Sequence, residues 1–184
     1  NQKGFIHYRA KEGNNHFLSN NSVFSITEDL NENLWIGTDN GLNFLDRAGG
    51  TFSYYFNDPA NTNSLSYNDV KALTFDDKGN LWIANHNGGL DYYDLEKNKF
   101  YHYKHNPDNP ASLYCNKVYG LLFDSNHNLW VMSNKDKDNN QYSYVQVIQK
   151  DRNGFITLNK KGYFGIIESR TGDIWIGSLG GIWH

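Results

Sequence analysis

The stretch Asn80-Leu81-Trp82-Ile83-Ala84 decides the fold, because close copies of it recur at regular distances along the chain. The tryptophans of successive copies are separated by 47, 48 and 45 residues. The other copies read Asn33-Leu34-Trp35-Ile36-Gly37, Asn128-Leu129-Trp130-Val131-Met132 and Asp173-Ile174-Trp175-Ile176-Gly177. Self-similarity with a period of about 20 to 50 residues is typical of folds built from repeated supersecondary units. The chain therefore contains four copies of one unit.

Two further landmarks keep the same register. An apolar or aromatic residue lies 12 positions before each tryptophan: Val23, Val70, Val118 and Tyr163. A phenylalanine lies 18 positions before each of the first three of these residues: Phe5, Phe52 and Phe100. Three landmarks in one register over several copies make chance similarity a poor explanation.

Each copy is predicted to form four short strands. In the second copy these are Val70–Phe75, Leu81–Ala84, Leu90–Asp94 and Phe100–Tyr103, separated by turns rich in Gly, Asn and Asp. Short runs of β-branched and aromatic residues between such turns indicate strands. Four antiparallel strands every ~45 residues indicate an all-β fold, a β-propeller of four-stranded blades. The predicted segments are an outer strand and loop at 1–22, blades at 23–69, 70–117 and 118–162, and a partial blade at 163–184.

Two repeated positions are assigned structural roles. The repeated tryptophan has apolar neighbours and recurs once per unit, so it is expected to pack between blades rather than to bind a ligand. The position two residues into the first strand is always small, namely Ser25, Ala72, Gly120 and Gly165. We expect the innermost strands to crowd together at the central channel, so that only a small side chain fits at this position.

Composition excludes several classes of function. The 184 residues have a net charge of -3 and no basic stripe, so no nucleic-acid partner is expected. No apolar run approaches the ~18 residues of a membrane span, so no membrane contact is expected. Cys115 is the single cysteine, which leaves no disulfide framework and no thiolate cluster for zinc. No cofactor or metal is expected.

The second copy resembles the two-component regulator propeller repeat. The resemblance is carried by Leu65-Ser66-Tyr67-Asn68-Asp69-Val70, by Phe75 to Ala84 and by Gly88-Gly89-Leu90, and the first copy is as close. It implies a periplasmic sensor region of a hybrid two-component system. Such regions carry long arrays of these repeats, followed by a membrane span and a histidine kinase.

This resemblance also implies a function and partners. The segment is expected to sense a ligand, with a small oligosaccharide as the ligand class, and to carry no enzymatic activity itself. Its other expected partners are the remaining propeller blades and signalling domains of the parent sensor, and a homodimer. The alternative is a structural module that supports ligand binding or dimerisation elsewhere in the sensor.

The sequence allows two arrangements of the blades, a closed ring and a sector of a larger ring. The chain opens on the outer-strand sequence Gly4–Tyr8, and the fourth copy reaches only Trp183 and His184. The N-terminal strand could complete the last blade of a four-bladed ring, or the chain could be a sector of a larger ring. We favour the sector, because the family usually closes with more blades.

Catalytic and metal-binding patterns are weak. Glu28 and Glu168 occupy equivalent positions and could act as the carboxylate pair of a propeller lyase or glycosidase, although a role in their hairpins is favoured. The stretch Asp136–Asn140 begins like a calcium loop but lacks its required Gly and Glu, so a solvated loop is expected. Its copy carries an insertion, which typically lies on the binding face.

The loops on one face of the propeller are the predicted ligand site. In a four-stranded blade, the loop between blades and the loop joining the second and third strands emerge together, and their Asn, Asp, His and aromatic residues suit a sugar. The candidate residues are Asp39, Asn40, Asn68, His86, Asn87, Asn116, Asn134, Lys135, Lys137 and Trp183. The repeated asparagines have an alternative role, which is to fold their own loops through bonds to the backbone.

Overall fold

A computed structural model describes residues 4, 6–11, 16–137, 140–149, 154–159 and 162–184. For residues 135–137, 140–142, 159 and 163–164 it describes the backbone alone. Every regular element of this described part is a β-strand. None of its residues form a helix of the length and apolarity that a membrane crossing requires.

The strands form four antiparallel sheets in sequence order. The first sheet comprises β1 (Val23–Glu28), β2 (Leu34–Thr38), β3 (Gly41–Asp46) and β4 (Thr51–Tyr55). The second comprises β5 (Val70–Phe75), β6 (Leu81–Asn85), β7 (Gly89–Asp94) and β8 (Lys99–Tyr103). The third comprises β9 (Val118–Phe123), β10 (Leu129–Lys137), β11 (Asn140–Ile148) and β12 (Ile156–Asn159). The last comprises β13 (Tyr163–Glu168), β14 (Ile174–Ser178) and β15 (Gly181–Trp183). The predicted all-β blade architecture is confirmed.

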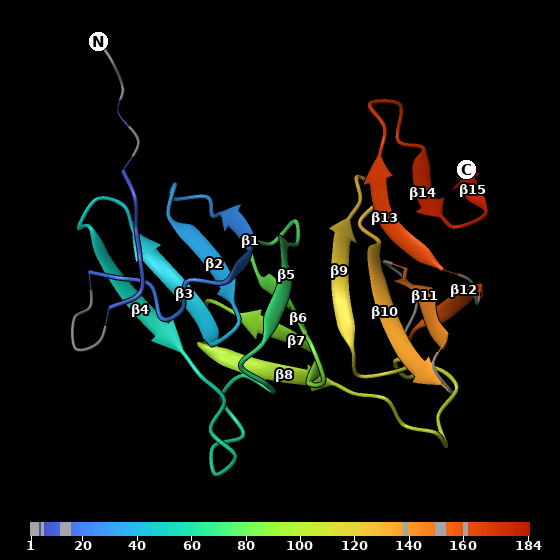
Figure 1. Cartoon of the computed structure of the whole chain (residues 1–184), viewed down its shortest axis with the longest axis horizontal. Helices are drawn as coiled ribbons and strands as arrows, with labels where there is room; N and C mark the ends of the chain where they lie inside the picture. Colours follow the sequence, from blue (N-terminus) through green and yellow to red (C-terminus); the bar gives the residue numbers. More distant parts are fainter. Residues whose placement is uncertain (1–3, 5, 12–15, 138–139, 150–153, 160–161) are drawn as a thin grey trace.

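The sheets stand side by side in an open row (Figure 1). The first strands of neighbouring sheets pack together, β1 on β5, β5 on β9 and β9 on β13. Figure 1 places the N-terminal segment at one end of the row and the last sheet at the other. Each sheet is therefore a propeller blade, and the row is the sector of a ring that the sequence favoured.

A bulge recurs at the start of every blade. The register shifts between Val23 and Ser25 in the first blade, and at the matching position in the other three. The small residues fall here, and they pair across the sheet with Gly37, Ala84, Met132 and Gly177. A Cβ added to Gly120 would meet the terminal methyl group of the flexible Met132 side chain, which would have to shift. At the equivalent Gly165 an added Cβ would meet nothing within 4 Å, so the neighbouring strand alone does not require a small residue in every blade.

The repeated tryptophans pack between blades. Trp35 is buried and its ring lies 4.8 Å from Phe44 and 5.9 Å from Tyr93 of the next blade. Trp82 and Trp130 join the next two interfaces. Trp175, on the blade at the end of the row, is 40% exposed. The predicted packing role therefore holds wherever a following blade is present.

In the first and third blades, an aspartate fixes both the first turn and the tryptophan. In the third blade, the Asp124 carboxylate accepts hydrogen bonds from the backbone N–H groups of Asn126 and Asn128 and, at 2.7 Å, from the Trp130 indole. Asp29 makes the same contacts in the first blade, at 3.2 Å to the Trp35 indole. The carboxylate therefore ties the turn to the blade core.

The N-terminal segment lies against the first blade as the outer strands of the first two blades lie against the blades that follow them, since Tyr8 meets Phe52 as Tyr55 meets Phe100 and Tyr103 meets Phe155. Residues 6–9 form no strand, and Phe5 lies outside the described residues. Tyr8 packs edge-on against Phe52 at 5.6 Å, and Ala10 forms an isolated bridge with Leu18. The bridge from Ala10 to Leu18 likewise repeats the one from His105 to Leu113. The described residues of the segment do not pair with the last sheet.

The solvated-loop prediction for Asp136–Asn140 is wrong where it can be checked. The strands β10 and β11 extend as a paired hairpin as far as Lys137 and Asn140. Residues 138–139 lie outside the described part. The insertion lengthens two strands because backbone pairing continues through a polar sequence whose hydrogen bonds it satisfies.

Replacing Asp124 by alanine is expected to destabilise the protein by about 3 kcal/mol, because a nearly buried acceptor of several hydrogen bonds is lost. Chemical denaturation followed by tryptophan fluorescence measures this. Asp108→Ala, on an exposed loop, is the control and should change stability by less than about 0.5 kcal/mol. Equal effects of the two substitutions would contradict the assigned role.

The stabilisation of the fold by the Asp124 carboxylate should disappear in acid. Burial acts to raise the pKa of Asp124, but the hydrogen bonds from Trp130, Asn128 and Asn126 outweigh it and hold that pKa below its usual value. A lowered native pKa stabilises the fold above the unfolded value of about 4, and the contribution is lost as the pH falls through the native pKa. The stability difference between wild type and Asp124→Ala should therefore shrink from pH 7 towards pH 3. A difference that stays constant would count against the ionised carboxylate.

Candidate ligand-binding face

The loops predicted to share one face are joined by backbone hydrogen bonds. Within the second blade, His86 N–H donates to the Asp69 carbonyl at 2.9 Å. Within the third blade, Asn134 N–H donates to the Lys117 carbonyl in the same way. Between blades, Gly41 N–H donates to the Asn68 carbonyl at 2.6 Å. The loop after the second strand is thus connected both to its own blade and to the next. This backbone frame positions the side chains of the face.

A pocket of about 410 Å³ opens in this face between the first two blades. We call it the loop pocket, and it is lined by Asp39, Asn57, Tyr67, Asn68, Asp69 and Asn87. Three of these, Asp39, Asn68 and Asn87, are predicted site residues. The structure thus brings together side chains from three loops that are up to 48 residues apart in sequence.

A charged network lies beside the loop pocket. Lys71 Nζ is 2.5 Å from Asp69 Oδ1 and 3.7 Å from Asp39 Oδ1, so it connects the two carboxylates that line the pocket. It also lies 3.4 Å from the centre of the Phe24 ring, as in a cation–π contact. The predicted site residue His86 places Nδ1 3.2 Å from Asp69 Oδ2. The network therefore fixes Asp69 from both sides and leaves Asp39 half exposed.

The repeated asparagines have the folding role that the sequence left open. Asn68 Oδ1 accepts the backbone N–H of Asn57 at 2.6 Å. Asn116 Oδ1 accepts that of His105 at 2.7 Å, also 11 residues earlier. The amide oxygen of each residue thus closes its own loop, although Asn68 also lines the loop pocket.

The remaining candidates are dispersed. Asn40 is exposed and donates its backbone N–H to Thr38 Oγ1. Asn134 is one blade further along, where its Oδ1 accepts from Ser143 Oγ at 2.8 Å. The side chains of Lys135 and Lys137 lie outside what the structure describes.

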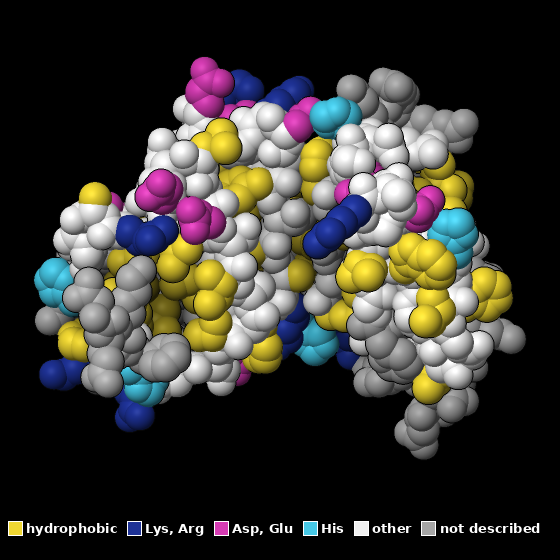
Figure 2. Space-filling model, turned by 90° about the horizontal axis from the view of Figure 1, so that it is seen from above, with side chains coloured by type: hydrophobic (Ala, Val, Ile, Leu, Met, Phe, Trp, Pro, Cys, Tyr) yellow, Lys and Arg dark blue, Asp and Glu magenta, His cyan; other side chains and the backbone are white. Residues whose placement is uncertain are grey.

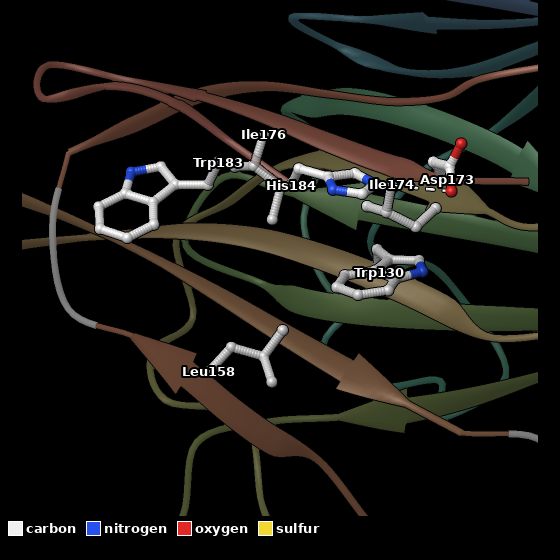
Figure 3. Close-up of a pocket in the computed structure, with 7 residues that line it drawn as sticks. All are labelled: Trp130, Leu158, Asp173, Ile174, Ile176, Trp183 and His184. Atoms are coloured by element: carbon white, nitrogen blue, oxygen red, sulfur yellow. Dashed lines mark ion pairs between the residues drawn. The ribbon is translucent and has the colours of Figure 1, made fainter.

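Trp183 lines a separate pocket of about 420 Å³ between the third and last blades (Figure 3). Figure 3 shows Trp130 and Leu158 facing Ile174 and Ile176 across this space. The Trp183 indole donates to Ser178 Oγ at 2.9 Å. This mainly apolar space corresponds to the blade interface that aromatic residues fill between the first two blades. Trp183 therefore does not share a site with the loop residues.

The two glutamates considered for catalysis lie on different blades. Glu168 accepts the backbone N–H of Ser125 at 3.0 Å and also its hydroxyl group, so it caps the first turn of the preceding blade. Glu28 forms an exposed ion pair with Arg47 at 3.5 Å. Neither glutamate lines either pocket. In the described part of the chain, no three His, Cys, Asp or Glu side chains are grouped to hold a metal ion.

A buried polar residue on the third strand of the blade anchors each loop, and sequence reasoning missed it. Asn43 Oδ1 accepts the Ser19 N–H at 2.8 Å, and Asp91 Oδ2 accepts the Ser66 N–H at 2.8 Å. Gln146 Oε1 accepts the Tyr114 N–H at 2.7 Å in the third blade. The three residue types differ, so only their common strand position could have revealed the shared role.

Charge is mixed on the surface seen in Figure 2, where acidic and basic side chains alternate. Hydrophobic side chains also reach the surface on both halves of this view. Large exposed hydrophobic residues occur on the first and last blades, among them Phe24, Ile26, Ile167, Ile182 and Trp183. These are the blades at the ends of the row, where a neighbouring sheet is missing on one side.

Comparison with known proteins identifies the repeat. The family model described as two component regulator propeller matches residues 18–40 and 64–87. These two segments thus match the repeat of this family, and the resemblance recognised in the sequence is confirmed. The two matched segments supply most of the loop pocket. No curated protein matches the chain.

Solved structures share the fold. The chain resembles the extracellular domain of BT3049 from B. thetaiotaomicron, a protein assigned to the hybrid two component systems, with 24% identity and a TM-score of 0.61. It also resembles PorZ, a surface component of the type-IX secretion system of Porphyromonas gingivalis, with 14% identity and a TM-score of 0.62. The match covers 90% and 97% of this chain. The chain spans 28% of the length of each of these structures.

Removing the Asn68 side-chain oxygen should destabilise the loop. Asn68→Ala loses a short bond to a backbone N–H and is expected to cost about 1–2 kcal/mol of unfolding free energy. Asn40→Ala removes an exposed side chain and should stay within about 0.5 kcal/mol of wild type. Urea denaturation of both variants measures the difference. If Asn68→Ala were as stable as Asn40→Ala, the folding role of this asparagine would be wrong.

Proposed function

We propose that this chain is a ligand-sensing segment of an extracellular two-component sensor and that its loop pocket binds a short oligosaccharide. The observation that carries the proposal is the convergence of polar and aromatic side chains from two blades on one pocket. The two component regulator propeller repeats support the sensor role. The proposed location is the periplasm, with the histidine kinase and the remaining blades in other parts of the parent sensor.

The chemistry of the pocket suits a sugar. Carboxylates and amides offer several hydrogen-bonding groups, and the 44% exposed Tyr67 offers a flat apolar face. Sugar rings present both hydroxyl groups and apolar C–H faces. A ligand that contacts Asp39 in the first blade and Asn87 in the second would favour one relative position of the two blades. Binding would in this way shift a conformational equilibrium that the sensor transmits.

The charges favour a neutral oligosaccharide over an anionic one. Asp39 and Asp69 both line the pocket, and Lys71 is already paired with them. A sulfate or uronate group would approach two carboxylates, which opposes binding.

Isothermal titration of the parent sensor region against neutral and anionic oligosaccharides tests the proposal. We expect a neutral oligosaccharide to bind, and we expect Tyr67→Ala to weaken it roughly tenfold because an aromatic contact is lost. Asp108→Ala, on the exposed loop between β8 and β9, is the control and should bind normally. A folded protein that binds no oligosaccharide would remove the glycan claim.

A structural module is the second candidate function. The use of the Asn68 and Asn116 amide oxygens in folding favours it, since part of the predicted site serves the loops. In that case the ligand site or dimer contact lies elsewhere in the sensor. The titration separates the two functions, because the structural module predicts unchanged ligand affinity for Tyr67→Ala and His86→Ala.

A further inference from the structure

Asp91 is a fully buried carboxylate beneath the loop that precedes the second blade. Its Oδ2 accepts from Ser66 N–H at 2.8 Å and from Asn85 Nδ2 at 2.9 Å. Its Oδ1 accepts from Ser66 Oγ at 2.5 Å and lies 2.7 Å from His102 Nδ1. A buried carboxylate is strongly unfavourable without a paired cation. His102 is the group placed to supply that charge.

Both ring nitrogens of His102 face acceptors. Nδ1 lies against Asp91 Oδ1, and Nε2 lies 2.9 Å from the Thr62 carbonyl oxygen. A neutral imidazole has one N–H group, so only the imidazolium form can donate to both acceptors. The hydrogen bond to Asp91 is the main cause that raises the pKa of His102, while burial and the charge of Lys104 act against it. The charged groups acting on His102 are therefore Asp91 from β7 and Lys104 just beyond β8.

The contacts of His102 hold one wall of the loop pocket. Thr62 and Ser66 belong to the loop between β4 and β5, and His102 Nδ1 is also 2.9 Å from Ser66 Oγ. The next three residues of this loop, 67–69, line the loop pocket. The Asp91–His102 pair thus binds Ser66, which directly precedes the first pocket-lining residue, Tyr67, of this stretch.

Neutral groups replace this pair in the neighbouring blades. In the first blade, Asn43 and Tyr54 are the cross-strand pair at the positions of Asp91 and His102, and the Tyr54 hydroxyl donates to the Phe17 carbonyl at 2.6 Å. In the third blade, the pair is Gln146 and Thr157, joined at 3.1 Å. Among the blades in which the structure describes both strands, only the second pairs a carboxyl group with an imidazole at these positions.

We propose that the Asp91–His102 pair is a proton-controlled clamp on the loop at residues 62–69. Protonated His102 ties Thr62 and Ser66 to the strands below. When the proton is lost, the remaining N–H stays with the buried carboxylate, and the Nε2 lone pair faces the Thr62 carbonyl. The loop then opens at Thr62. Any effect of this opening on ligand affinity rests on the proposed function, but the clamp itself does not.

The direction of the pH effect follows from the linkage. Because the pKa of His102 is higher in the folded protein than in the unfolded chain, its contribution to loop stability is fully present below about pH 6.5. That contribution is lost as the pH rises through the pKa of His102 in the folded protein. Mild acid therefore closes the loop and mild alkali releases it.

Hydrogen–deuterium exchange on the 184-residue chain tests the clamp. After correction for intrinsic rates, opening of residues 61–69 should rise roughly tenfold or more between pH 6 and pH 9, since one charge-assisted hydrogen bond is lost. Residues 18–22, anchored by the neutral Asn43, are the internal control. The double variant Asp91→Asn, His102→Tyr copies the neutral pair of the first blade and should show no such rise. Equal pH dependence in wild type and the variant would overturn the proposal.

Titration of the His102 ring by NMR in the wild-type chain is a second test that needs no variant. We expect a pKa above the ordinary value of about 6.5. A value at or below it would overturn the clamp even if the double variant does not fold. Neither measurement uses a ligand, so failure of the clamp and failure of the proposed function can be told apart.

Discussion

Each sheet of this protein is apolar on both faces, and the rest of the structure depends on that constraint. In β6, Leu81 and Ile83 pack towards the first blade, whereas Trp82 and Ala84 pack towards the third. Alternating side chains point to opposite faces of a strand, so one blade cannot bury all of these residues alone. Burial therefore requires a neighbour on each side. The blades stack, and the loops at their ends are brought together as a consequence.

The division of labour between strands and loops follows from this stacking. The side chains on the strands serve the packing between blades. Trp35 is buried by the next blade, whereas Trp175, at the end of the row, is exposed. The second blade differs from its neighbours beneath the loops, where the strands β7 and β8 carry Asp91 and His102. A pocket lined by carboxylate, amide and phenol groups includes the three residues that follow Ser66, which this pair binds. The proposed recognition site and its proposed control would therefore share the face that the core leaves free.

The sequence predicted the repeated architecture well because each landmark has a local cause. The strands of the second blade begin and end within one residue of their predicted limits. Contacts between blades were harder to predict. Lys71 looks like an ordinary strand residue, and only stacking brings its amine to Asp39 of the preceding blade. The role of Asp91 was missed for the same reason, since its partner His102 lies on the neighbouring strand and its loop arrives from 25 residues earlier.

The central claim is that ligand recognition takes place at the loops between the first two blades. Chemical-shift mapping of the chain with a neutral oligosaccharide tests this claim most directly. We predict that the amide shifts change for Asp39, for residues 67–69 and for Asn87, with little change around Trp130 and Trp183. Changes confined to the space between Trp130 and Trp183, or spread evenly over the blades, would contradict it.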